Sequence, residues 1–362
     1  MSDLPLPPGT RLLHIGPHKT GTTALQIALG KNREALLEQG VRYRWCGDHL
    51  NANLAALALA GRSTRRSASA KPVPIKHWRS VVQKVAAASD TERIVISGEE
   101  FCSLSERTIQ KVLSELDERR AHVLITLRPL DKIIVSQWQQ YVQSGAVTKP
   151  VSEWARAVLN RENSVEKVQG FWERHDHGAL IERWSNIAGR DKVTVVVLDE
   201  NDRTFLFRTF EKLIGVTAGT LSADDRLVNR SLTWEEAEAM RSMYTLLREK
   251  NLDDLSDHLR FMISPSESIK RERRPSKEEI RIVLESSELV KARAIGRASA
   301  ERIRASGVRG IGELEHLNGS QNLATEFSSS QPHMIPVDLA GWIAFGVIDR
   351  SGISRGNLPP VT

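Results

Sequence analysis

The chain has 362 residues, of which 40% are hydrophobic and 27% are charged, so it can bury a sizeable core. Its formal net charge of +6 favours anionic ligands in general and does not single out nucleic acid. Two cysteines, Cys46 and Cys102, exclude a disulfide framework and lack a metal-binding spacing. The segment MSDLPLPPGT has no signal-peptide pattern and no run of about 18 apolar residues occurs, so we expect a cytoplasmic protein without a transmembrane segment.

The first part of the chain alternates between patterns typical of strands and patterns typical of helices. A compact apolar run at 11–15 predicts a buried strand, and the apolar spacing at 22–37 predicts a helix after a short loop. Further strands are predicted at 93–97 and 122–127, and further helices at 49–60, 78–88, 106–120 and 131–144.

The same alternation continues to about residue 250. One more strand is predicted at 192–198, with helices at 154–159, 171–187, 205–214 and 234–250. Beyond it we expect a basic break at 265–275, a long charged helix at 277–305, a polar linker at 319–333 and an amphipathic segment at 337–348.

Strands separated by helices predict an α/β fold, in which helices flank a parallel β-sheet of the P-loop type. We expect residues 1–264 to form this α/β domain and residues 265–362 to form a helical C-terminal extension.

The segment Gly16-Pro17-His18-Lys19-Thr20-Gly21-Thr22-Thr23 joins the first predicted strand to the first predicted helix. A glycine-rich turn at this place binds anions, because backbone N–H groups point inward and the helix N-terminus adds partial positive charge. The nucleotide-binding form of such a turn is GxxxxGK[ST]. Gly16, Gly21 and Thr23 fit that spacing, but the lysine is Lys19, inside the loop.

The position of this lysine points to a particular chemistry. A nucleotide hydrolase needs magnesium and a carboxylate after a strand, and no clear carboxylate of that kind is present. The strand at 93–97 leads to Glu99 and Glu100, and the strand at 122–127 leads to Arg128. A lysine within the loop suits contact with the oxygen that bridges a phosphate and a leaving sulfonate, without a metal.

The loop resembles the phosphosulfate loop of sulfotransferases that use phosphoadenosine phosphosulfate (PAPS), which has the form Pro-Lys-[Ser/Thr]-Gly-Thr-[Thr/Ser]. Here His18 is inserted after Pro17, and the HKTGTT form looks like the bacterial branch. The family's second signature is an arginine at a strand end and a serine eight residues later, which Arg128 and Ser136 match. Weaker matches lie at Phe171-Trp172, Trp184, 193–200, Asn229-Arg230-Ser231-Leu232 and the basic segment Gly307-Val308-Arg309-Gly310.

The resemblance covers roughly residues 11–250 and implies transfer of a sulfuryl group from PAPS to a hydroxyl or amine, which releases adenosine 3′,5′-bisphosphate (PAP). It implies no metal. It assigns Arg128 and Ser136 to the 3′-phosphate and the loop to the phosphosulfate, through His18, Lys19, Thr20, Gly21, Thr22 and Thr23.

A general base is expected for the acceptor proton. Glutamates follow the corresponding strand in related bacterial and carbohydrate sulfotransferases, so Glu99 is our first candidate, and Glu100 and His18 stay open. His49 and Glu100 are candidates for acceptor binding. The sequence leaves the acceptor open between a small molecule, a glycan, a glycolipid and a peptide side chain. We do not expect it to be nucleic acid. The oligomeric state is equally open.

Two alternatives remain open at the level of the sequence. One is a deviant P-loop kinase or nucleotide hydrolase, which would need magnesium. The other is a non-catalytic nucleotide- or RNA-binding protein. Two features disfavour it: only 5% of the residues are aromatic, and no motif for stacking on bases lies beside the basic run at 62–71.

Overall fold

The computed structural model describes residues 4–43, 52–64, 71–222, 230–251, 264–319 and 334–350. The chain falls into two compact units, each of which is described by itself. The first contains residues 1–130, 173–227 and 293–319, and the second contains residues 131–172, 228–292 and 320–362. The division expected at residue 264 stays a prediction.

The first unit is built on a parallel sheet of six strands in the order β2-β3-β1-β4-β5-β6, which confirms the predicted α/β fold class. Its central strands are buried because runs of valine, isoleucine and leucine are covered on both faces. The strands are β1 (Arg11–His14), β2 (Val41–Arg42), β3 (Arg93–Ser97), β4 (Ala121–Leu127), β5 (Val193–Val197) and β6 (Arg309–Ile311).

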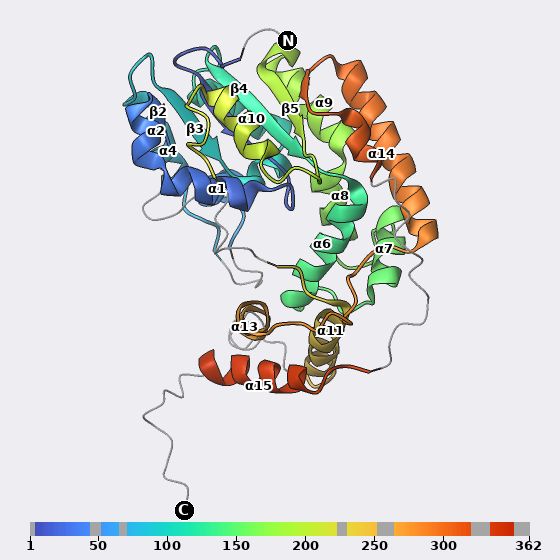
Figure 1. Ribbon diagram of the computed structural model, residues 1–362. Helices are drawn as coiled ribbons and strands as arrows, with labels where there is room; N and C mark the ends of the chain where they lie inside the picture. Colours follow the sequence, from blue (N-terminus) through green and yellow to red (C-terminus); the bar gives the residue numbers. More distant parts are fainter. Residues whose placement is uncertain are drawn as a thin grey trace, which may run out of the picture. The chain divides into compact units, whose positions relative to one another are not determined.

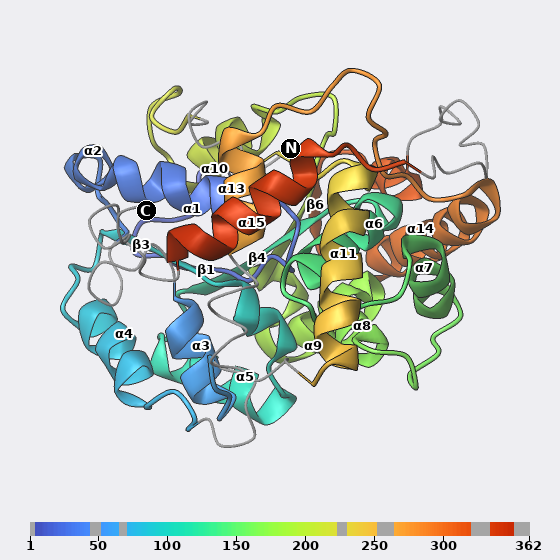
Figure 2. The ribbon, with the colours of Figure 1, turned by 90° about the horizontal axis from the view of Figure 1, so that it is seen from below.

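Helices cover both faces of this sheet. Figure 2 shows α1 (Thr22–Lys31), α2 (Arg33–Glu38) and α10 (Phe205–Ile214) on one side of the strands. The helices on the other side are α3 (Asn53–Leu59), α4 (Lys76–Ala86), α5 (Glu106–Glu115) and α9 (His177–Ala188). The described residues of the unit also contain the 3₁₀ helices η1 (Glu99–Ser103), η2 (Arg190–Lys192) and η4 (Leu314–Asn318).

The strand order creates a switch point between β1 and β4. These strands are neighbours, but the chain leaves β1 toward β2 at one edge of the sheet and leaves β4 toward β5 on the other side. Crevices at the carboxyl ends of strands at such a point are where parallel α/β sheets bind ligands. The loop that begins at Gly16 and the residue Arg128 both follow strands at this edge.

Two predicted helices are each divided in the structure. The segment expected at 22–37 forms α1 and α2, which meet at Asn32. The segment expected at 171–187 forms α8 (Val168–His175) and α9, because the carboxylate of Asp176 accepts a hydrogen bond from the N–H of Ala179 and begins a new helix.

The second unit is helical in its described residues. Aromatic rings form its core, with Tyr141 and Phe171 each in an edge contact with Trp154, at centroid distances of 5.7 and 5.8 Å. Its helices include α6 (Leu130–Gln143), α7 (Val151–Leu159), α11 (Trp234–Glu249), α13 (Ser264–Glu272) and α15 (Asp338–Arg350) (Figure 1).

Two expectations for the C-terminal part are wrong. The segment predicted as a break at 265–275 contains helix α13, whose basic last turn suits a helix C-terminus. The helix predicted at 277–305 begins only at residue 286, as α14 (Ser286–Ser306), because the preceding residues pair with α11 instead: the N–H of Trp234 donates to the carbonyl of Ile280.

Candidate functional site

The loop from Gly16 to Thr23 leaves the central strand β1 and enters α1. Gly21 caps α1 with φ 81°, a left-handed conformation that favours glycine, and Lys19 adopts φ 71° although it carries a side chain. Within the described residues, none of the backbone N–H groups of residues 19–24 donates a hydrogen bond. The loop therefore presents a row of unused donors at a helix N-terminus, as an anion site requires.

A buried polar network supports this loop from below. Ser97 lies 2.9 Å from His14 Nδ1 and accepts a hydrogen bond from Gln26, while Thr126 lies 3.2 Å from His14 Nε2 and 2.8 Å from the hydroxyl of Thr20. Thr20 in turn donates to the carbonyl of Pro17 in the loop, at 2.7 Å.

One arrangement of protons satisfies every member of this network. Gln26 donates to Ser97, Ser97 donates to Nδ1 of His14, Nε2–H of His14 donates to Thr126, and Thr126 donates to Thr20. Complete burial lowers the pKa of His14 to about 3, so this imidazole stays neutral. The network thus fixes the loop without placing a charge beneath it.

Gly16 is required by the same network. A Cβ at this position would lie 2.0 Å from Thr126 Oγ1 and 2.8 Å from His14 Nε2, which is closer than any real contact. The first glycine of the motif therefore makes room for the side chains that hold the loop.

His18 lies between the two glutamates that follow β3. Its Nδ1 is 3.2 Å from Glu99 Oε2, and its Nε2 is 3.2 Å from Glu100 Oε1. All three side chains are largely buried, with exposed fractions of 16–18%. The structure thus brings together three residues that the sequence singled out from two separate segments.

The two glutamates have different acidities. Burial raises the pKa of Glu99 above the ordinary range, and the charges of His18 and Lys19 oppose this only in part. Burial also acts to raise the pKa of Glu100, but the hydrogen bond to His18 and the charges of His18, Arg174 and Arg62 outweigh it, so this pKa is lowered. Such a separation assigns different roles to neighbouring carboxylates, and it favours Glu99 as the proton acceptor.

Lys19 belongs to the same group of charges. Burial lowers the pKa of its ammonium group, Glu99 counters that shift, and Arg128 adds to it. Lys19 is therefore within electrostatic reach of both the candidate base and the arginine after β4.

Arg128 is held by an acidic residue at the end of the neighbouring strand. Its Nε and Nη2 donate to Oε1 and Oε2 of Glu200, both at 2.6 Å. Nothing in the sequence alone indicated this partner, because 72 residues separate the two positions. The adjacent ends of β4 and β5 explain it, since Leu127 pairs in register with Val197.

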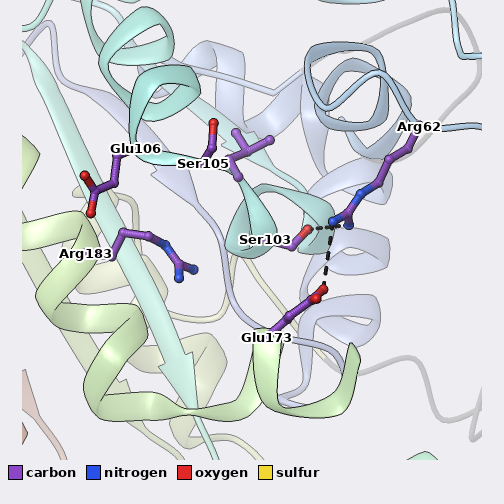
Figure 3. A pocket seen from close by; sticks show the side chains of 7 residues that line it. Arg62, Ser103, Ser105, Glu106, Glu173 and Arg183 are labelled. Carbon is purple, nitrogen blue, oxygen red and sulfur yellow. Dashed lines mark hydrogen bonds and ion pairs between the residues drawn. The ribbon is translucent and has the colours of Figure 1, made fainter. Parts of the chain in front are cut away.

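A pocket with a cavity volume of about 420 Å³ lies beside η1 in the first unit (Figure 3). Arg62 reaches into it and contacts Ser103 Oγ at 2.9 Å and Glu173 at 4.0 Å. The sequence offered no signal for this pocket beyond the basic run that starts at Arg62. Its lining consists of Arg62, Ser103, Leu104, Ser105, Glu106, Glu173 and Arg183.

Other predicted residues have different outcomes. Ser136 belongs to α6, in the second unit, so its contact with the 3′-phosphate stays a prediction. His49, Cys46 and Asn229 lie outside the described residues. Thr22 is buried and Thr23 is exposed at the start of α1, and their contacts with the cofactor also stay predictions.

The weak match at Gly307-Val308-Arg309-Gly310 leads into strand β6. Arg309 starts strand β6 and pairs in register with Thr194 near the amino end of β5, and its charge acts on His122 at the amino end of β4. It therefore lies at the edge of the sheet opposite the loop from Gly16 to Thr23.

Among the described residues, no helix is long and apolar enough to cross a membrane. Within the same part of the chain, no group of three or more His, Cys, Asp or Glu side chains is placed to hold a metal ion.

No protein-family model matches the chain, and no curated protein matches it. Among solved structures, the chain is similar to a sulfotransferase from Alicyclobacillus acidocaldarius, with a TM-score of 0.41 and 16% sequence identity. That likeness covers 69% of this chain and 98% of the other.

Proposed function

We propose that the chain is a sulfotransferase that moves a sulfuryl group from PAPS to a hydroxyl or amine of an acceptor and releases PAP. One observation carries the proposal: His18 of the loop lies 3.2 Å from Glu99, so the adjacent loop cation Lys19 and the candidate base lie at the same edge of the sheet as Arg128. A loop cation, a candidate base and a candidate phosphate ligand thus gather at the switch point of the sheet.

The chain's donor groups fit such a ligand. The unused N–H groups of residues 19–24 and the ammonium group of Lys19 suit the phosphosulfate, and the fork of Arg128 suits the 3′-phosphate. When bound, PAPS supplies a sulfuryl group attached to a phosphate that leaves readily. Ser136 is proposed as the second ligand of the 3′-phosphate, on the resemblance alone.

The roles of the side chains follow from their places. As the acceptor oxygen forms its bond to sulfur and the bond from sulfur to the bridging oxygen breaks, Glu99 takes the acceptor proton. Lys19 and the loop N–H groups stabilise the negative charge that collects on the departing phosphate. His18 bridges Glu99 and Glu100 and orients both, so we assign it a positioning role. A cytoplasmic location stays a prediction.

Radiolabelled PAPS and a panel of hydroxyl-bearing and amine-bearing compounds test this proposal. The full chain should transfer label to at least one acceptor in the presence of EDTA, and Lys19→Ala should lower the rate at least about 100-fold. Lys84→Ala on α4, at a distance from the loop, is the matched control and should keep the wild-type rate. Turnover of magnesium-ATP with no transfer from PAPS would instead favour the kinase or hydrolase alternative.

A further inference from the structure

The pocket beside η1 has the size of a small-ligand site. Its volume of about 420 Å³ falls in the usual range of roughly 300–1,000 Å³. It is unusual in its lining, because six of the seven residues are polar or charged and none is aromatic. Its hydrogen-bonding groups therefore suit a ligand that carries several polar groups of its own.

The charges of the lining are balanced. Arg62 and Arg183 supply guanidinium donors, and Glu106 and Glu173 supply carboxylate acceptors. Figure 3 shows Arg62 and Glu173 on one side of the pocket, with Arg183 and Glu106 across from them. A ligand with a net negative charge would meet carboxylates on both sides. Hydroxyl groups, which both donate and accept, satisfy both kinds of partner.

Some of these groups have unused bonding capacity. Among the described residues, the side chain of Glu106 forms no hydrogen bond or ion pair, and Nε of Arg183 has no hydrogen-bond partner although it is buried. Arg183 donates from Nη2 to the carbonyl of Cys102 at 2.6 Å, which fixes its guanidinium group. An acceptor and a fixed donor are thus ready for a ligand.

The pocket is joined to the proposed reaction site. Arg62 contacts Ser103 in the lining and lies 4.0 Å from Glu100 Oε2, which in turn contacts His18. The 3₁₀ helix η1 carries Glu99 at its start and Ser103 at its end, so the two are roughly 8 Å apart at about 2 Å per residue. A ligand in the pocket is therefore close to the reacting hydroxyl without being that hydroxyl.

We infer that this pocket is a subsite for a hydroxyl-rich acceptor, a glycan that places one sugar between Arg62 and Glu106 and presents a hydroxyl of the next sugar to Glu99. The inference rests on the proposed function, because it names the acceptor class of that same site. Arg62 links recognition of the sugar to the His18–Glu100 contact.

Binding of neutral disaccharides tests the inference without PAPS. Cellobiose and lactose are the probes, 1-hexanol and 4-nitrophenol are the apolar comparisons, and saturation-transfer NMR on the full chain is the readout. We expect the disaccharides to bind and Glu106→Gln and Arg62→Lys each to weaken binding about tenfold. Glu301→Gln, an exposed glutamate on α14, is the matched control and should leave binding unchanged.

The outcomes separate this inference from the proposed function. Absence of disaccharide binding, equal binding by Glu106→Gln and wild type, or preferred binding of the apolar alcohols would overturn the inference even if PAP binds tightly. If disaccharides bind through Glu106 but PAP does not bind, the proposed function fails and the acceptor role of the pocket fails with it.

Discussion

Arg128 and Glu200 form a bidentate ion pair in which both hydrogen bonds measure 2.6 Å. The guanidinium edge that carries Nε and Nη2 is one of the two edges with which arginine binds a phosphate, so a 3′-phosphate bound there would compete with the carboxylate. We therefore predict that Glu200→Gln tightens PAP binding about two- to five-fold, because a partly exposed pair is worth up to about 1 kcal/mol. Calorimetric titration measures the change.

Arg302 and Glu182 provide the control for this prediction. They form a similar bidentate pair, at 2.9 and 2.7 Å, on α14 and α9. Glu182→Gln should leave PAP affinity unchanged. Unchanged or weaker PAP binding in Glu200→Gln would mean that Glu200 positions Arg128 rather than competing for it.

Glu99 should set the acidic limb of the pH profile. Its raised pKa means that it is protonated at pH values where an ordinary glutamate is already ionised, and a base must be ionised to act. The rate should therefore fall as the pH drops through this raised pKa. Glu99→Gln should lower kcat about 100-fold and abolish that limb, whereas Glu100→Gln should retain it. An unaltered pH profile in Glu99→Gln would remove Glu99 from the mechanism.

Gly16 should tolerate no side chain. Gly16→Ala brings its Cβ to 2.0 Å from Thr126 Oγ1, so we expect a loss of unfolding free energy of about 2 kcal/mol or more, together with weaker PAP binding. Gly310→Ala on β6 is the control, because a Cβ there meets nothing within 4 Å. Urea unfolding compares the two, and equal stability of both variants would contradict the role given to the network around His14.

The buried histidines should make the fold sensitive to acid. Burial lowers the pKa of His14 to about 3 and that of His122 and His177 to about 4. The unfolded chain takes up these protons near pH 6.5 and the folded chain does not, so stability falls as the pH drops below about 6.5. At about pH 5 the expected loss is on the order of 2 kcal/mol per histidine.

Urea unfolding at about pH 7 and about pH 5 measures this loss. His122→Gln removes one of the titrating groups and keeps a donor for Thr194, whose hydroxyl lies 2.8 Å from His122 Nε2. The variant should lose less stability between the two pH values than the wild type. Equal losses of stability in the variant and the wild type would show that His122 does not contribute to the acid sensitivity of the fold.

The sequence predicted the sheet better than the helix ends. Every predicted strand forms, because each has a buried centre of apolar residues. Helix boundaries depend on local caps such as Asp176, which interrupted a predicted helix. Strands β2 and β6 were missed, because segments of two and three residues have no strand pattern and form only by pairing with β3 and β5.

The candidate site was predictable where its residues are close in sequence. The loop was visible as a motif, and Glu99 and Arg128 were visible as the residues after strands. The bridge from His18 to both glutamates, and the pair of Arg128 with Glu200, depend on which strands become neighbours. His14 and Thr126 looked like ordinary members of apolar strands, and only their mutual contact identifies the network below the loop.

The most direct test of the central claim is calorimetric titration of the full chain with PAP in EDTA, with magnesium-ADP as the comparison. We predict that PAP binds without metal and more tightly than magnesium-ADP, and that Arg128→Ala weakens PAP binding about 10- to 100-fold, since hydrogen bonds to charged groups contribute about 1.5–3 kcal/mol. Preference for magnesium-ADP, or binding of neither nucleotide, would contradict the assignment of the chain as a PAPS-dependent sulfotransferase.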